Sequence, residues 1–132
     1  MISLDTNILV RLLTNDDPKQ ALKARVTLDQ ALEDQHRIWI SLVVVCELVW
    51  VLQRLYGYDK TQVVLAVTAL LKFSGLEIEN PKAVKKALDQ LQHSPADFSD
   101  VLLGHLCIEQ GAAHVLTFDK KAAKLATHKL LA

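Results

Sequence analysis

The sequence predicts an α/β fold in which a central parallel sheet is flanked by helices. Two patterns favour it: short apolar runs alternate with longer stretches of helical periodicity, and the first and fourth runs end at an acid. Successive parallel strands need a crossover between them, and a helix usually supplies it. The chain has 132 residues, of which 51% are hydrophobic, enough for a core without disulfides. We therefore expect a single domain over residues 1–132.

Capping signals divide the first part of the chain. Pro18 follows two aspartates, and a proline just inside a helix start is typical of a helix N-terminus. Ser41 and Asp59 are residue types that cap helices, and Gly57 favours a helix end. The elements expected here are a strand at residues 1–4, helices at 8–13 and 18–33, a strand at 38–40, and helices at 42–56 and 60–73.

The second part of the chain repeats this alternation. Pro81 opens a polar helix, Gly111 closes a later one, and no linker or internal repeat separates them. The elements expected here are a strand at residues 76–78, helices at 81–92 and 97–110, a strand at 114–117, a short helix at 120–126 and an edge strand at 129–131.

Composition excludes several classes of protein. Fifteen basic and fifteen acidic side chains give zero net charge, which speaks against a wholly basic nucleic-acid coat or a polybasic membrane binder. The longest apolar stretch, residues 42–52, is far shorter than the ~20 residues of a membrane span. Cys46 and Cys107 form no CxxC pair and are expected to be small buried hydrophobes in a reducing cytoplasm.

Acidic residues occupy positions that this alternation would bring together. Asp5 directly follows the first strand and Asp119 the fourth, and ligand sites in parallel sheets lie beyond the carboxyl ends of strands. Asp97 and Asp100 share a face at a helix start because they are three residues apart. Each aspartate also has an ordinary explanation, since an acid at a helix start caps the helix and suits its dipole.

Glu47 is expected to be buried, because apolar residues surround it on both sides in sequence. An unpaired buried carboxylate costs roughly several kcal/mol, so it must be paired, protonated or bound to a cation. No lysine or arginine lies within one helical turn, which leaves a salt bridge to a distant base as the alternative.

One arrangement explains all these acids, namely convergence on a shared metal site. Carboxylates in one pocket repel each other by up to about 4 kcal/mol per close pair at intermediate dielectric. Divalent cations relieve that repulsion, and an all-oxygen ligand set suits Mg²⁺ or Mn²⁺ rather than Zn²⁺. The chemistry this predicts is metal-assisted phosphoryl transfer or hydrolysis.

The same residues resemble the PIN domain, and more narrowly the VapC ribonuclease toxins of prokaryotic toxin-antitoxin pairs. The matching segments occur in order along almost the whole chain: Leu4-Asp5-Thr6-Asn7, Cys46-Glu47-Leu48-Val49-Trp50-Val51-Leu52, Asp97-Phe98-Ser99-Asp100 and Thr117-Phe118-Asp119. The resemblance implies a three-layer sandwich and a metal site of Asp5, Glu47, Asp100 and Asp119. It also implies that Thr6 or Asn7 and Thr117 hold carboxylates in place, and that Asp97 is a cap or a further ligand.

By the same resemblance, metal-activated water would attack a phosphodiester bond of RNA. A homodimer and a cognate VapB-type antitoxin are the partners implied. Arg11, Lys120, Lys121 and Lys124 are candidates for phosphate contacts, although the lysines also fit a solvated helix face. The chain after Asp119 is brief, which predicts a short or absent last strand.

Two other α/β classes share an acid at the first strand end. A haloacid-dehalogenase-like phosphatase would have a second aspartate two residues after Asp5, where this chain has Asn7. A Mg²⁺-binding receiver-type signalling module would have a phosphorylatable aspartate after a central strand, and residues 40–41 and 78–80 supply none. The sequence therefore favours the nuclease.

Overall fold

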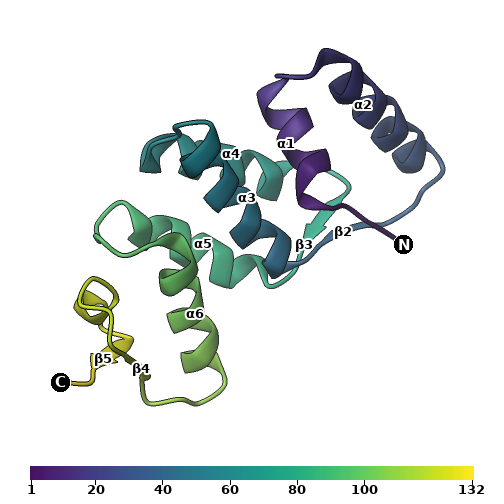
Figure 1. The fold of residues 1–132 in the computed structure, drawn as a ribbon. Helices are drawn as coiled ribbons and strands as arrows, with labels where there is room; N and C mark the ends of the chain where they lie inside the picture. The colour runs from purple at the N-terminus through teal and green to yellow at the C-terminus, as the bar shows by residue number, and fades with distance from the viewer. The chain divides into compact units, whose positions relative to one another are not determined.

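A computed structural model describes residues 1–132 and shows an α/β fold with parallel strands, as predicted. The chain divides into two compact units, residues 1–79 and residues 80–132 (Figure 1). Each unit has its own small parallel sheet and its own buried apolar residues. The expectation that residues 1–132 make one domain stays a prediction.

The first unit contains a three-stranded parallel sheet in the order β1-β2-β3. Ile38 pairs with Ile2 on one side and with Leu76 on the other, so β2 is the central strand. Four helices connect the strands, which is the crossover that parallel pairing requires (Figure 1). The elements are β1 (Ile2–Ser3), α1 (Thr6–Thr14), α2 (Pro18–Glu33), β2 (Ile38–Ile40), α3 (Leu42–Leu55), α4 (Lys60–Lys72) and β3 (Leu76–Ile78).

Side-chain caps begin the helices of this unit where the sequence indicates. Asp17 accepts a hydrogen bond from the Gln20 amide at the start of α2, and Ser41 accepts one from the Val44 amide at the start of α3. At α4, Asp59 and Gln62 bond reciprocally in a capping box. Each cap stabilises its helix by about 1 kcal/mol. Local signals thus set the starts of these helices.

The second unit pairs two helices with a two-stranded parallel sheet. Apolar residues of α5 and α6 are buried, among them Val84, Leu91 and Phe98. Val115 of β4 pairs with His128 of β5, and the turn between the two strands buries Ala122 and Leu125. The elements are α5 (Pro81–Leu91), α6 (Phe98–Glu109), β4 (Val115–Thr117), the 3₁₀ turn η1 (Ala122–Lys124) and β5 (His128–Leu130), the last two near the yellow end of the chain in Figure 1.

The C-terminal segment differs in detail from expectation. The short helix expected at residues 120–126 is a three-residue 3₁₀ turn. The last strand is short, as predicted, and it is a genuine parallel partner of β4. No helix of the chain has the length and apolar character needed to cross a membrane.

Candidate active site

In the first unit, the Thr6 side chain links two of the predicted acids. Asp5 follows β1 and caps α1, and its Oδ1 accepts a hydrogen bond of 2.7 Å from the Thr6 amide. The buried Thr6 hydroxyl donates to Glu47 Oε2 at 2.8 Å. Asp5 and Glu47 accordingly line one pocket of about 360 Å³. The hydrogen bond from the Thr6 hydroxyl to Glu47 agrees with the predicted role of Thr6 in holding a carboxylate.

Glu47 is exposed, so the prediction of its burial is wrong. The apolar neighbours that suggested burial, such as Val45 and Leu48, turn toward the core at helical spacing. Glu47 lies on the opposite face of α3 together with Val43 and Trp50, which are also exposed. Water and the Thr6 hydroxyl can therefore satisfy this carboxylate, and desolvation does not by itself demand a cation there.

An arginine and a tyrosine complete the wall of this pocket. Arg11 and Tyr56 both line it, and both contact Asp16. Arg11 Nη1 lies 3.1 Å from Asp16 Oδ1, and the Tyr56 hydroxyl donates to Asp16 Oδ2 at 2.5 Å. The hydrogen bond from Tyr56 lowers the pKa of Asp16, and Thr14 and Arg11 contribute in the same direction. The sequence offered Arg11 as a phosphate ligand but gave no signal for Asp16 or Tyr56.

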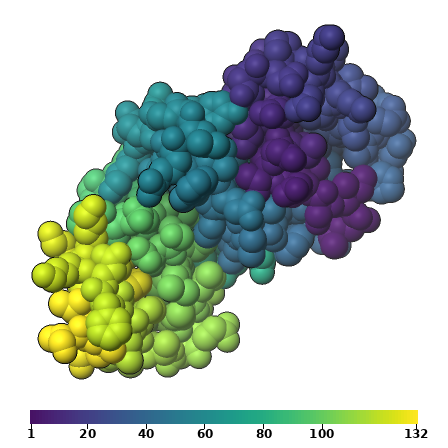
Figure 2. Space-filling model, in the orientation of Figure 1, coloured from purple at the N-terminus to yellow at the C-terminus, as the bar shows by residue number.

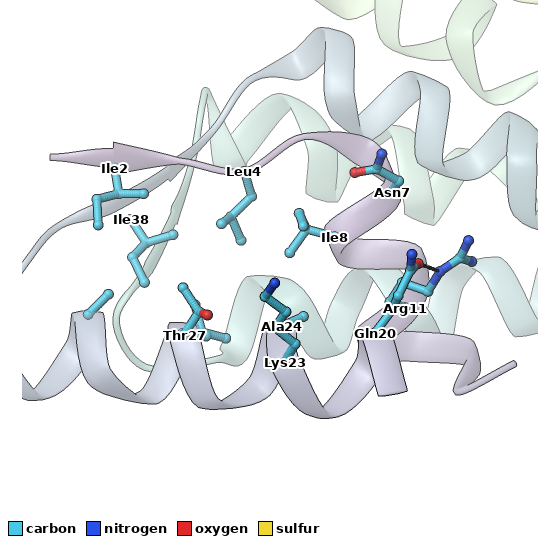
Figure 3. A pocket seen from close by; sticks show the side chains of 12 residues that line it. Ile2, Leu4, Asn7, Ile8, Arg11, Gln20, Lys23, Ala24, Thr27 and Ile38 are labelled. Atoms are coloured by element: carbon cyan, nitrogen blue, oxygen red, sulfur yellow. Dashed lines mark hydrogen bonds between the residues drawn. The ribbon is translucent and has the colours of Figure 1, made fainter. Parts of the chain in front are cut away.

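A second, largely apolar hollow of about 350 Å³ lies in the same unit. In Figure 3, Ile2 of β1, Leu4 of the segment that follows and Ile8 of α1 face it. Ala24 and Thr27 face it from α2. The N-terminal segment and α2 leave a corresponding gap in the surface in Figure 2. No carboxylate lines this hollow, which adjoins the acidic pocket because Asn7 and Arg11 line both.

In the second unit, Asp100 is the centre of the acidic group. Burial raises the pKa of the Asp100 carboxyl, and the charges of Asp97 and Asp119 raise it further, while His128 has the opposite effect. Asp97 stands at the N-cap position of α6 but makes no side-chain capping hydrogen bond. Asp97 is therefore the N-cap residue, as the sequence suggests, but it does not cap through its side chain. Three of the predicted acids interact electrostatically within this unit.

Asp119 is held by the turn that follows β4. Its amide donates to the Thr117 hydroxyl at 3.0 Å, and its Oδ1 accepts from the Lys121 amide at 2.8 Å. Thr117 thus fixes the backbone of Asp119, whereas its predicted contact with a carboxylate stays a prediction. Lys120, Lys121 and Lys124 are exposed, as a solvated face requires.

His128 is a residue that sequence reasoning missed. Only 7% of the residue is exposed. Its Nδ1 lies 2.8 Å from the Thr127 hydroxyl, and its buried Nε2 has no hydrogen-bond partner. The one available signal was Gly104 in the middle of α6, where a Cβ atom would lie 2.2 Å from Thr127 Oγ1.

The donor chemistry of these residues fits a divalent cation of the Mg²⁺ or Mn²⁺ type. The predicted ligands Asp5, Glu47, Asp100 and Asp119 supply only carboxylate oxygens, which hard divalent cations prefer. Neither the Arg11–Asp16 nor the Arg37–Glu77 ion pair engages any of them. Neither unit contains a group of three His, Cys, Asp or Glu side chains that could hold a metal ion. Each unit supplies two of the four predicted ligands.

Comparison with known protein families identifies a match. The family model described as the PIN domain matches residues 2–127, which include all five predicted acids. A search of curated proteins found no match.

Proposed function

Because this chain belongs to the PIN-domain family, a family of metal-dependent nucleases, we propose that it is an endoribonuclease that hydrolyses RNA phosphodiester bonds. The observation that carries the proposal is the pairing of acids within each unit, Asp5 with Glu47 and Asp100 with Asp119, inside the matched region. The match favours this function over the phosphatase and the receiver-type module.

In this proposal Asp5, Glu47, Asp100 and Asp119 hold Mg²⁺ or Mn²⁺, and Asp97 is a further carboxylate beside Asp100. The chemistry supplied by such ions is activation of water and neutralisation of charge on the phosphate. Thr6 orients Glu47 through its hydroxyl, and the Asp5 carboxylate is fixed by the Thr6 amide. The chain itself thus orders both ligands of the first unit in advance.

Substrate phosphate would meet Arg11 at the pocket that Asp5 and Glu47 line. Asp16 on one side and Gln20 on the other hold the guanidinium, with Arg11 Nε lying 2.6 Å from Gln20 Oε1 (Figure 3). A guanidinium held in this way contacts phosphate without reading base sequence. Tyr56 offers an aromatic ring at the same pocket, a surface on which an unpaired RNA base can stack.

We further propose that the chain is a VapC-type toxin, a cytoplasmic homodimer inhibited by a cognate VapB-type antitoxin. Large apolar side chains support an interface, because Val43, Trp50, Leu55 and Leu65 of α3 and α4 are each more than half exposed. Exposed apolar clusters commonly mark protein partners. Both cysteines are free thiols, which suits a reducing compartment. A small reading frame for a DNA-binding protein beside the gene is the expected genomic sign.

The decisive experiment compares two capping aspartates. Asp5→Asn removes a proposed ligand while keeping a good helix cap, so the fold should survive. Asp17→Asn makes the same change at the start of α2, outside the proposed site. Purified protein, freed of any antitoxin, should cleave RNA with Mg²⁺ or Mn²⁺; Asp5→Asn should abolish cleavage and Asp17→Asn should not. Full activity of Asp5→Asn, or cleavage that persists in EDTA, would overturn the proposal.

A further inference from the structure

The pocket that Asp5 and Glu47 line has an apolar part as well as an acidic one. Its walls come from α1 and α3, which lie side by side in the first unit (Figure 1). Glu47, Val51 and Leu55 all line the pocket, and because they follow one another at four-residue intervals they form one stripe along α3. At 1.5 Å per residue this stripe is about 12 Å long. The lining of α3 thus changes from an acid to aliphatic side chains within two turns.

Helix α1 shows the same change along the pocket. Thr6 and Val10 are four residues apart and both line it. The Thr6 hydroxyl donates to Glu47 Oε2 at 2.8 Å, so the polar ends of the two helix stripes coincide. Beyond the other end, the Tyr56 hydroxyl donates to Asp16 Oδ2 at 2.5 Å and connects the residue after α3 to the turn after α1. Two side-chain hydrogen bonds therefore hold the walls of this pocket together.

The apolar end of the pocket consists of Val10, Val51, Leu55 and Tyr56. A ligand that fills both ends needs an anionic group for Arg11 or a metal ion and an apolar face for this end. A nucleotide combines the two, because its phosphate is anionic and its base stacks on apolar and aromatic side chains. The pocket volume of about 360 Å³ lies in the usual range for small-ligand sites, roughly 300–1,000 Å³.

We propose that this apolar end is the subsite for the base of a nucleotide next to the cleaved bond. Val51, Leu55 and the Tyr56 ring contact the face of the base, while the phosphate lies toward the acidic end. The inference rests on the proposed function, because it assigns the second half of the same pocket to the same RNA substrate. Aliphatic side chains contact any base through its face and form no hydrogen bonds with its edge. The subsite therefore requires a base without reading which base is present.

The test combines a change in the protein with a change in the RNA. Leu55→Ser alters a side chain that is 69% exposed at the apolar end, so the fold should survive. Leu22→Ser is the matched control, because Leu22 is 65% exposed on α2 and lines neither of the two pockets described. The substrate is a single-stranded RNA oligonucleotide whose cleaved bond has been mapped. Further copies of it each lack the base of one nucleotide on either side of that bond.

Cleavage with Mg²⁺ gives kcat/KM for each pair of protein and RNA. In the wild type, loss of the base that occupies the subsite should lower kcat/KM about fivefold or more, as loss of one stacked base does elsewhere. Leu55→Ser should lower kcat/KM for intact RNA about threefold or more, because apolar contact is lost. The same variant should lose little more when the base is also missing. Leu22→Ser should behave as the wild type does.

Four results would contradict the base subsite. One is equal kcat/KM in the wild type for the intact RNA and every copy that lacks a base, and another is equal cleavage by Leu55→Ser and Leu22→Ser. If Leu55→Ser does not fold, Val51→Thr replaces it, since threonine keeps the branched shape and adds a hydroxyl; wild-type kcat/KM in that variant is the third.

The fourth result concerns a protein partner, because Leu55 also belongs to the exposed side chains of the proposed interface. A changed oligomeric state of Leu55→Ser in size-exclusion chromatography, with unchanged cleavage, would assign the apolar end to protein contacts and overturn the base subsite. Wild-type protein that cleaves no RNA would instead refute the proposed function itself, and this inference with it.

Discussion

The two units present their acids by different physical means. In the first unit, hydrogen bonds order the carboxylates: the Thr6 amide and hydroxyl bind Asp5 and Glu47 respectively. In the second, Asp100 is partly buried and lies among like charges. The first arrangement is satisfied without a cation, whereas the second stores repulsion that a cation would relieve. Carboxylates of the same kind can thus be preorganised for a metal ion in two ways: hydrogen bonds can fix their orientation, or the fold can hold several negative charges close together.

The largest expected effect is on stabilisation by Mn²⁺. A ligand at 100 times its Kd stabilises the folded state by about 2.7 kcal/mol, so Mn²⁺ should raise the Tm of the wild type clearly. Glu47→Gln and Asp100→Asn should each shrink that rise, as thermal denaturation with and without Mn²⁺ can show. In the absence of metal the two variants should differ in Tm. Asp100→Asn should raise Tm because it removes a charge that lies among like charges, while Glu47→Gln should not. An unchanged metal response in both variants would count against the proposed ligands.

Packing offers a second contrast between the units. The first unit leaves a hollow of about 350 Å³ beside α2, whereas the second packs Thr127 directly over Gly104. Gly104→Ala should therefore destabilise the protein by about 1–3 kcal/mol, the usual cost of overpacking, although alanine is the better helix former. Urea denaturation measures this change. A stabilised Gly104→Ala protein would show that residues 127 and 128 do not pack closely on α6.

The smallest expected effect is a pH dependence of opposite sign in the two units. The pKa of Asp100 is raised above its ordinary 3.8, so its contribution to stability is fully present below that value and is lost as pH rises through the raised pKa. The pKa of Asp16 is lowered, so its contribution is present above 3.8 and is lost as pH falls through the lowered pKa.

These signs can be checked in metal-free buffer by comparing Tm values across pH. At neutral pH, Asp100→Asn should melt above the wild type and Asp16→Asn below it. Both differences should disappear at strongly acidic pH, where the aspartates of the wild type are protonated. Shifts of the same sign in the two variants would contradict the contrast between the units.

Local chemistry explains how much of the fold the sequence predicts. Caps such as Asp17, Ser41 and Asp59 act within one helical turn. The periodicity of apolar residues can be recognised without knowing which segment packs against them. Those signals place the helices of both units and four of the strands close to their observed bounds. The same reasoning failed at Glu47, because apolar neighbours in sequence occupy several faces of a helix and only one of those faces is buried.

The sequence by itself determined the alternation of strands and helices and the acids that end or begin them, since both depend on a few consecutive residues. Tertiary structure alone decided that Thr6 bonds to Glu47, that Asp16 joins Arg11 to Tyr56, and that His128 is buried over Gly104. These contacts join residues distant in sequence or depend on the packing of one segment against another. No pattern of neighbouring residues records them, because they form only when the segments pack.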